Sequence, residues 1–372
     1  MGHRIAAAFV ASSLAWWSSP AALASCEDWN TREFFLNAST DDVVRCLEEG
    51  VDPNAIDEAG LTPLHGTGVF MTDIAATAAL LEAGAKLEAE SAIGIRPLHT
   101  AALNQNPAVA KMLLEAGAEV DARSDADSTP LIMAAGGNRI VSVVDVLLEA
   151  GADVNAQNRD GTSPLHGAAQ VNTAEVVAAL LQAEANVEAR NASEETALIL
   201  AAGGNPDVAV ITALLEAGAD VTAQAASGDT ALHLAALQNP NLEVTAALLE
   251  AGAEVDARNH ANETALHFAA FRSQNPAIVT ALLEAGADVS ARRENEMTPL
   301  HVAIMNPAAG KMIDLLLDAG ADPDATDKDG ATPLDFADRN PARRDSYDYD
   351  RLRQLRVESE ASAVEGVDDG QH

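Results

Sequence analysis

The sequence predicts an all-α solenoid built from stacked helix-turn-helix units. Three observations lead to this prediction: a period of 33 or 34 residues, a leucine pair in most periods, and helix start and stop signals at fixed places within each period. One phase of the period is marked by Leu64, Leu98, Leu131, Leu165, Leu198, Leu232, Leu266, Leu300 and Leu334. Such self-similarity indicates units that bury their apolar sides against one another.

Each period contains the signals for two helices. In one unit Thr264 is placed to cap the first helix, and small alanines follow where a neighbouring helix must approach closely. A leucine pair and then Gly286 mark the end of the second helix. An Asn-Pro dipeptide often precedes that helix, and we expect it to supply the cap and the first helical residue. It occurs at Asn106-Pro107, Asn205-Pro206, Asn239-Pro240, Asn275-Pro276 and Asn306-Pro307.

These residues resemble the ankyrin repeat. Thr298-Pro299-Leu300-His301-Val302-Ala303 and Gly151-Ala152-Asp153-Val154-Asn155-Ala156 match its two signatures almost letter for letter, and the resemblance covers about residues 27 to 356. It implies an ankyrin-repeat solenoid in which each unit is a helix pair with a projecting β-turn finger. It also implies that the stack binds another protein along its concave face.

Five segments are expected along the chain. They are an export signal at 1–24, an N-terminal capping half-repeat at 25–59, eight repeats at 60–329, a C-terminal capping repeat at 330–357 and a disordered acidic tail at 358–372. The first segment has Arg4, an apolar run and a final Ala-Leu-Ala, which is the layout of a cleaved signal peptide. In the second, Trp29, Phe34 and Phe35 are placed to cover the open end of the stack.

Charge and hydropathy restrict the function and location. The chain has 57 Asp and Glu against 22 Lys and Arg, which gives a formal net charge of −35. This balance argues against nucleic-acid binding, because contacts to phosphate need clustered Lys and Arg side chains. The acid excess keeps a long solenoid soluble and, as a weaker inference, favours basic or neutral partners. After the export signal, no apolar stretch is long enough for a permanent membrane span. We therefore expect a monomer that is periplasmic or secreted.

Two cysteines admit two interpretations. Cys26 and Cys46 are an even pair in an exported chain, which favours a disulfide contributing about 3 kcal/mol to the N-terminal cap. Alternatively, the sequence ending at Cys26 resembles a bacterial lipobox, in which Cys26 would carry lipid. The disulfide is the favoured interpretation because lipidation would leave Cys46 as an unpaired thiol.

Leu237, Phe271 and Met305 occupy equivalent positions in three consecutive repeats, just after the first-helix alanines that the family resemblance places beside its groove. Phe271 with Arg272 is the preferred anchor for a partner, because aromatic and Arg residues dominate interface energies. Ile95 and Met297 are secondary candidates at the finger tips. The competing interpretation is that these side chains cover the ends of their own helices.

The positive charge near the fingers comes from Arg258, Arg292 and Arg293. Together with the candidate contact residues, it predicts a protein-binding module that acts outside the cytoplasm through its groove and finger tips. The alternative is a membrane-anchored scaffold lipoprotein of the cell envelope.

Nothing in the sequence indicates a catalytic, cofactor or metal site, and we do not expect an enzyme. Six histidines share one repeat position, but stacked helices lie about 8 to 10 Å apart, too far for side chains of successive repeats to share zinc. We expect each imidazole to hydrogen-bond locally and to link adjacent loops, as the resemblance implies. They are His65, His99, His166, His233, His267 and His301.

Three departures from the repeat pattern lie in the middle of the chain. Ile132 and Ile199 replace the recurrent histidine, and Glu184 replaces the helix-ending glycine at a cost of about 1 kcal/mol if it keeps a positive φ. We therefore expect the region around residues 184–204 to be the softest part of the stack.

Overall fold

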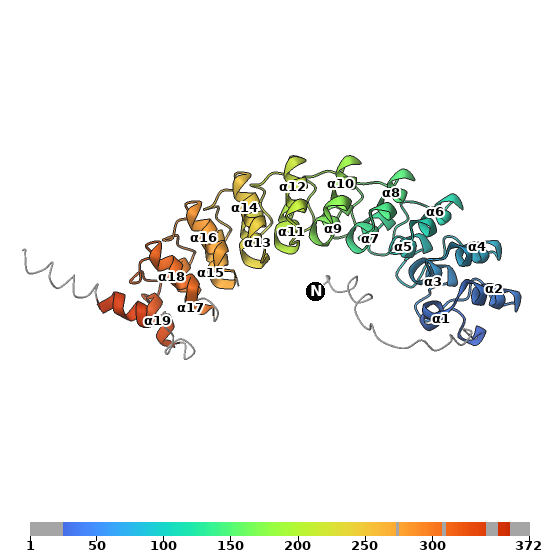
Figure 1. Ribbon diagram of the computed structural model, residues 1–372, viewed down its shortest axis with the longest axis horizontal. Coiled ribbons are helices and arrows are strands. Elements are labelled where there is room, and N and C mark those ends of the chain that lie inside the picture. The colour runs from blue at the N-terminus through green and yellow to red at the C-terminus, as the bar shows by residue number, and fades with distance from the viewer. Residues whose placement is uncertain (1–24, 273–274, 307–309, 340–348, 358–372) are drawn as a thin grey trace, which may run out of the picture. The chain divides into compact units, whose positions relative to one another are not determined.

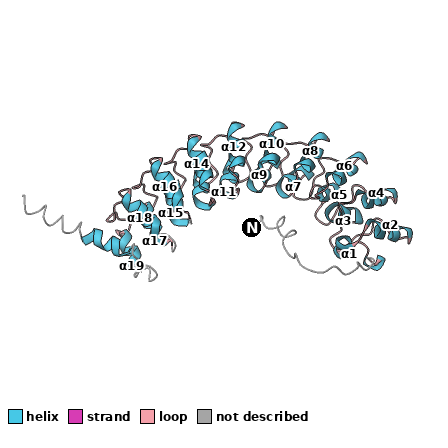
Figure 2. Cartoon of the chain, in the orientation of Figure 1, coloured by secondary structure: helices cyan, strands magenta, loops and turns pink. Residues whose placement is uncertain are grey.

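The computed structural model describes residues 25–272, 275–306, 310–339 and 349–357. The expected export signal and acidic tail, residues 1–24 and 358–372, lie outside the described residues. The chain divides into two compact units, residues 1–192 and 193–372. In its described part the chain is helical, with no strand beyond an isolated bridge between Gln224 and Thr230 (Figure 2). The predicted helical solenoid is confirmed.

In its described part, residues 25–192, the first unit contains a 3₁₀ helix, η2 (Cys26–Asp28), and ten α-helices. These are α1 (Arg32–Asn37), α2 (Thr40–Glu48), α3 (Pro63–Phe70), α4 (Ile74–Glu82), α5 (Pro97–Ala101), α6 (Pro107–Glu115), α7 (Pro130–Gly137), α8 (Val141–Glu149), α9 (Pro164–Val171) and α10 (Ala174–Gln182). Helices α3, α5, α7 and α9 pack successively in one layer, and α2, α4, α6, α8 and α10 pack in a second (Figure 1). Each repeat contributes one helix to each layer.

The second unit repeats this arrangement. Its helices are α11 (Ala197–Gly204), α12 (Val208–Glu216), α13 (Ala231–Gln238), α14 (Leu242–Glu250), α15 (Ala265–Arg272), α16 (Pro276–Glu284), α17 (Pro299–Met305), α18 (Gly310–Asp318) and α19 (Pro333–Arg339). Residues 349–357 form a further helical segment. The odd-numbered helices from α11 to α19 form one layer and the even-numbered helices from α12 to α18 the other.

The core of each unit lies between its two layers. The repeat-marking leucines are almost fully enclosed, as at Leu232 and Leu266, and so is the first leucine of each pair, as at Leu248. Ala235 and Ala269 are also fully buried, because the first helices of neighbouring repeats approach each other at these small side chains. The Leu and Ala positions read from the sequence are therefore packing positions between repeats.

The Asn-Pro dipeptides have two different roles. Asn106 and Asn275 cap α6 and α16 as expected, and each is followed by Pro in the first turn. Asn205 and Asn239 instead end the preceding helices, while Asp207 and Asn241 cap α12 and α14, so the expected helix starts at these two sites are wrong. Asn306 likewise ends the preceding helix, α17, and the proline that follows it lies outside the described residues.

Burial explains the shift at Asn239. Its side chain is 3% exposed, and its Nδ2 donates to the carbonyl oxygens of Ala202 at 2.9 Å and Asn205 at 2.8 Å in the preceding repeat. The Oδ1 atom accepts the N–H of Asn241 at 3.0 Å. This buried amide therefore joins two repeats, and the capping role passes to a residue two positions later.

The N-terminal end of the first unit is covered by aromatic rings. Phe34 and Phe35 are buried and pack edge-to-face at 5.2 Å between ring centroids, and Trp29 packs on Phe34 at the same distance. The ring of Phe35 occupies the space that a Cβ at Gly66 would take. A disulfide between Cys26 and Cys46 ties η2 to α2, with 5.4 Å between the Cα atoms.

At the C-terminal end of the second unit, the helical segment 349–357 packs beside α18 and α19. Arg351 pairs with Asp314 and Asp318 of α18, and Arg356 lies 4.0 Å from a carboxylate oxygen of Asp335 in α19. These contacts hold the segment against the last two helices of the unit.

Candidate interaction surface

The recurrent histidines join each repeat to the next. In α15 the Nδ1 atom of His267 accepts the N–H of Thr264 at 3.2 Å, which places the proton on Nε2. Nε2 then donates to the carbonyl oxygen of Met297 in the following finger, at 3.2 Å. The same pair of bonds recurs at His65, His99, His233 and His301. For these five residues the expected link between loops is confirmed.

Burial keeps these imidazoles neutral. His267 is 1% exposed, and loss of hydration lowers its pKa from 6.5 to about 4, with the hydrogen bond to Met297 acting in the opposite direction. Burial likewise lowers the pKa of His65, His99, His233 and His301. Both ring nitrogens of these side chains are engaged by the protein, so the histidines hold repeats together rather than forming a metal ladder.

The irregular repeats lack parts of this pattern. Ile132 and Ile199 are buried where the histidine would stand, and an apolar side chain provides no ring nitrogen to reach the next finger. Glu184 has φ +66°, the left-handed conformation that glycine adopts at the same place in other repeats, for example at Gly252 with φ +91°. Glu184 therefore keeps the glycine-like backbone at the steric cost of a Cβ.

Arg and Gln side chains tie the bases of the fingers together. Nη1 of Arg258 donates to the carbonyl oxygens of Asn262 in its own finger, at 3.2 Å, and Arg292 in the next finger, at 2.8 Å. Arg292 makes the equivalent bonds to Glu296 and Thr326. The sequence predicted these two arginines as charges for a partner, but their guanidinium groups also order the fingers. The repeat period contains the signal for this role, because Arg123 and Gln157 make the same bonds 34 residues apart.

Met297 is not exposed as the sequence predicted, and partner binding by Ile95 stays a prediction. Met297 is 3% exposed, because its sulfur accepts N–H groups from Arg293 at 3.3 Å and Asn295 at 3.1 Å. Its side chain is therefore unavailable to a partner. Ile95 is half-buried, and its carbonyl oxygen accepts the bond from His65. Arg293 also pairs with Glu263 at 2.6 Å, which neutralises that charge locally.

The predicted apolar residues of the second unit lie in three packed helices. Leu237, Phe271 and Met305, named here the apolar row, stand at or near the ends of α13, α15 and α17, which pack against one another in that order. Phe271 is 42% exposed and Met305 46%, while Leu237 is half-buried. The structure therefore brings these three side chains to neighbouring places in the layer of first helices and leaves two of them largely open to solvent.

Two arginines lie beside the apolar row. Arg272 follows Phe271, and Arg339 stands one repeat beyond Met305 with its guanidinium 6.0 Å from the ring centroid of Phe336. No ion pair of either arginine occurs among the described residues. The repeat positions of Phe271 and Arg272 hold no Asp or Glu in any repeat of this unit. Sequence reasoning missed Arg339, although the 34-residue step from Met305 leads directly to it.

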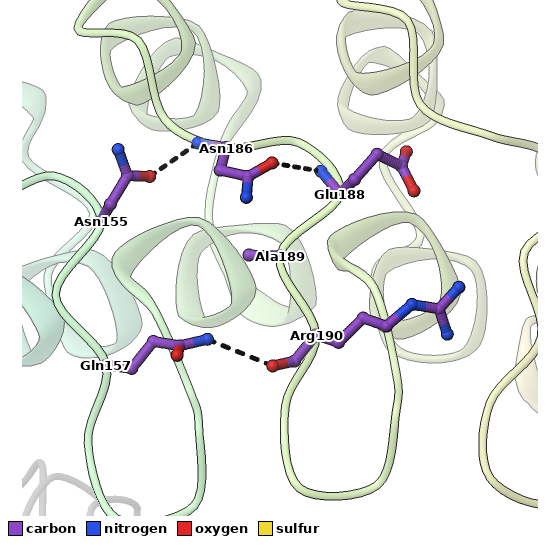
Figure 3. Close-up of a pocket in the computed structure, with 6 residues that line it drawn as sticks. All are labelled: Asn155, Gln157, Asn186, Glu188, Ala189 and Arg190. Atoms are coloured by element: carbon purple, nitrogen blue, oxygen red, sulfur yellow. Dashed lines mark hydrogen bonds between the residues drawn. The ribbon is translucent and has the colours of Figure 1, made fainter.

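A polar pocket lies in the first unit between two finger bases (Figure 3). Its lining residues are Asn155, Gln157, Asn186, Glu188, Ala189 and Arg190. Asn155 Oδ1 accepts the N–H of Asn186 at 2.7 Å, and Gln157 Nε2 donates to the carbonyl oxygen of Arg190 at 3.1 Å. These side chains join successive repeats, and the lining contains no Ser, Cys or His to serve as a nucleophile or base.

The described residues contain no group of three or more His, Cys, Asp or Glu side chains arranged to hold a metal ion. Asp327 accepts the N–H groups of Asp329 and Ala331 and so forms a finger turn. None of the helices described here combines the length and apolar character needed to cross a bilayer.

Comparison with known proteins agrees with the repeat geometry. A family model described as "Ankyrin repeats (3 copies)" matches residues 35–124, 131–225, 198–293 and 266–346. Among solved structures, the crystal structure of the human ASB11 ankyrin repeat domain is similar, with a TM-score of 0.55 and 31% sequence identity over 61% of this chain and 99% of that one. No curated protein sequence matches the chain. Because the family model matches most of its length, the chain belongs to the ankyrin-repeat family.

Proposed function

We propose that this chain binds another protein through the apolar row of its second unit, outside the cytoplasm. Ankyrin repeats bind other proteins, so the family indicates a protein-binding module. The observation that selects the surface is the alignment of exposed Phe271 and Met305 in packed helices beside Arg272. The ankyrin fold is a protein-interaction scaffold, and we propose no enzymatic role.

Phe271 is the side chain from which we expect the largest contribution. An exposed aromatic ring gains free energy when a partner removes it from water, and it loses little conformational entropy because it has two side-chain torsions. Arg272 adds a guanidinium that binds carboxylate in a fixed, two-pronged geometry. Met305 is flexible and polarisable, so it adapts to the shape of what covers it. This combination is typical of the centre of a protein interface.

A photo-crosslinking pull-down from the native host tests the proposal. Phe271→Asp places a charge in the centre of the surface. We expect the amount of captured partner to fall at least about tenfold, which corresponds to a loss of about 1.4 kcal/mol of binding free energy. Leu103→Asp is the matched control, because Leu103 holds the equivalent position in the first unit and is 37% exposed. Equal capture by both variants, with unchanged circular dichroism, would refute the apolar row as the contact surface.

We further propose that the protein is exported and remains free rather than lipid-anchored. The basis is the signal-like sequence of residues 1–24 together with the Cys26–Cys46 disulfide, a bond that persists in oxidising compartments. A sulfur engaged in this bond is not available to carry lipid. Intact mass spectrometry distinguishes the two forms: loss of two protons supports the disulfide, and an acyl mass on Cys26 supports the envelope lipoprotein. If the disulfide is found, we also expect a soluble periplasmic pool of the protein and a monomeric mass by light scattering.

A further inference from the structure

The helical segment 349–357, named here the edge helix, is attached to α18 differently from the way the second helices inside the stack are attached to each other. Helices α14, α16 and α18 each bury three side chains, all of them apolar except Thr245. In the edge helix only Tyr349 and Leu352 are buried. Because burial of apolar side chains supplies most of the attraction between packed helices, the edge helix is held less firmly by this means.

Ion pairs supply a second part of the attachment. Nη1 of Arg351 lies 2.5 Å from a carboxylate oxygen of Asp314, and Nη2 lies 2.6 Å from one of Asp318. These two acids stand one turn apart on α18, so a single planar guanidinium binds both of them. Helices α14 and α16 contain no Lys or Arg and cannot be joined in this way. The edge helix thus depends on charge where α14 and α16 depend on apolar packing.

Both ion pairs are accessible to water and salt. The side chain of Arg351 is 27% exposed, and those of Asp314 and Asp318 are 32% and 66% exposed. Salt weakens ion pairs of this kind, because dissolved ions screen the charges. The edge helix is also too short to remain helical in water without tertiary contacts, so we expect it to unfold whenever it leaves α18. Attachment and helix formation are therefore one equilibrium, which salt and competing cations shift.

The surface under the edge helix combines carboxylates with an apolar contact. Arg351 occupies both Asp314 and Asp318, and no other cation pairs with these acids among the described residues. Leu352, the next residue, is 1% exposed, so an apolar contact accompanies the ionic one. An arginine followed by a leucine is thus the pattern that this surface accepts. The net charge of −35 adds long-range attraction for a cationic partner.

We propose that the edge helix is displaceable and that the surface under it binds a basic amphipathic helix of another protein in its place. The partner helix carries an arginine followed by an apolar residue, because its guanidinium replaces Arg351 and its apolar side chain replaces Leu352. Lysine fits less well, since one ammonium nitrogen does not reproduce the planar fork of a guanidinium. The selecting carboxylates lie on α18, in the layer of second helices, whereas the apolar row stands in the layer of first helices. The two partner sites are therefore tested separately.

Hydrogen exchange in the full chain tests whether the edge helix is displaceable. Arg351→Glu removes both ion pairs, so we expect the amides of the edge helix to exchange at least about tenfold faster in this variant. Arg353→Glu is the matched control and should change the exchange little, because Arg353 is exposed on the same helix and lies over the Tyr349 ring. In the starting protein, raising NaCl from about 50 mM to about 500 mM should accelerate this exchange about fivefold. Equal exchange in the two variants, or exchange that salt leaves unchanged, would contradict the ionic attachment.

A labelled peptide with the sequence of the edge helix tests the uncovered surface. Fluorescence anisotropy follows its binding to the full-length Arg351→Glu chain, at protein concentrations up to about 1 mM, which is the effective concentration that tethering provides. We expect saturable binding that weakens at least about tenfold when the peptide carries Arg351→Lys. Adding Asp314→Asn/Asp318→Asn to the chain should abolish the binding. Asp145→Asn/Glu149→Asn, which removes the acids at the equivalent positions of α8, should not. A peptide that does not bind, or that binds both Asn variants equally, would overturn the proposal.

Discussion

Nε2 of His267 lies 3.2 Å from the carbonyl oxygen of Met297, thirty residues later in the chain, and donates a hydrogen bond that holds one finger to the helix before it. The bond requires a neutral imidazole whose Nδ1 accepts the N–H of Thr264. Protonation of Nδ1 would place its N–H against the backbone N–H of Thr264, and this hydrogen bond would be lost. The arrangement therefore links the stability of the stack to pH.

Acid is expected to destabilise the protein between pH 6.5 and about 4. The pKa of His267 is lower in the folded chain, about 4, than its ordinary value of 6.5, so the unfolded chain binds more protons in this range. Stability is thus full above pH 6.5 and falls as the pH drops, by up to about 3 kcal/mol for this residue alone. Urea unfolding at a series of pH values measures it. His267→Ile, which copies Ile132 and Ile199, should be less stable at pH 7 but less sensitive to acid, whereas an unchanged pH dependence would contradict the assignment.

Removing a buried hydroxyl is expected to stabilise the second unit. Thr245 is fully buried in α14, and its Oγ1 has no hydrogen-bond partner among the described residues. The equivalent position holds Val177 in α10 and Val279 in α16. Thr245→Val keeps the shape and removes an unsatisfied polar atom, so the free energy of unfolding should rise by about 1 kcal/mol. The control is Thr212→Val, at a hydroxyl that donates to Val208 on the exposed side of α12, where no gain is expected in the same melts.

Glu184→Gly should also stabilise the chain, by about 1 kcal/mol, because glycine adopts φ +66° without the clash of a Cβ. Amide hydrogen exchange before and after the substitution tests the expectation that residues 184–204 are the softest region. We expect the fastest-exchanging amides of the starting protein in this region, and slower exchange there in the variant. Ala183→Gly, one residue earlier at φ −83°, should instead destabilise the helix end. Uniform exchange across all repeats would contradict this prediction.

Reduction of the disulfide is expected to weaken the N-terminal cap. The bond closes a loop with a sequence separation of 20, for which the loss of loop entropy in the unfolded chain is worth about 3 kcal/mol. Cys26→Ser/Cys46→Ser should therefore lower the unfolding midpoint of the first unit and expose Trp29, which tryptophan fluorescence reports. Reducing agent should expose Trp29 in the starting protein in the same way. It should cause no further change in the double variant, which has no disulfide to lose. A midpoint that does not move would show that the aromatic contacts alone hold the cap.

The amino-acid sequence was sufficient for the repeat architecture. The helices follow from local signals, such as the Thr cap, that recur with the 34-residue step. Their buried faces follow from the recurring leucines, such as Leu232 and Leu266. It was also sufficient to align Leu237, Phe271 and Met305, because equal spacing in the sequence becomes a row in a stack.

Tertiary structure decided which aligned residues remain available. Met297 is buried because Arg293 and Asn295 fold over its sulfur, and Asn239 turns inward to the carbonyl groups of the preceding repeat. Arg258 bonds to two fingers, whereas Arg272, at the end of α15, forms no ion pair with the described residues. The contacts at Met297 lie within one finger and those at Asn239 and Arg258 join neighbouring repeats, and the shared repeat pattern encodes neither. Exposure, and with it the choice of the binding surface, is a property of the stack.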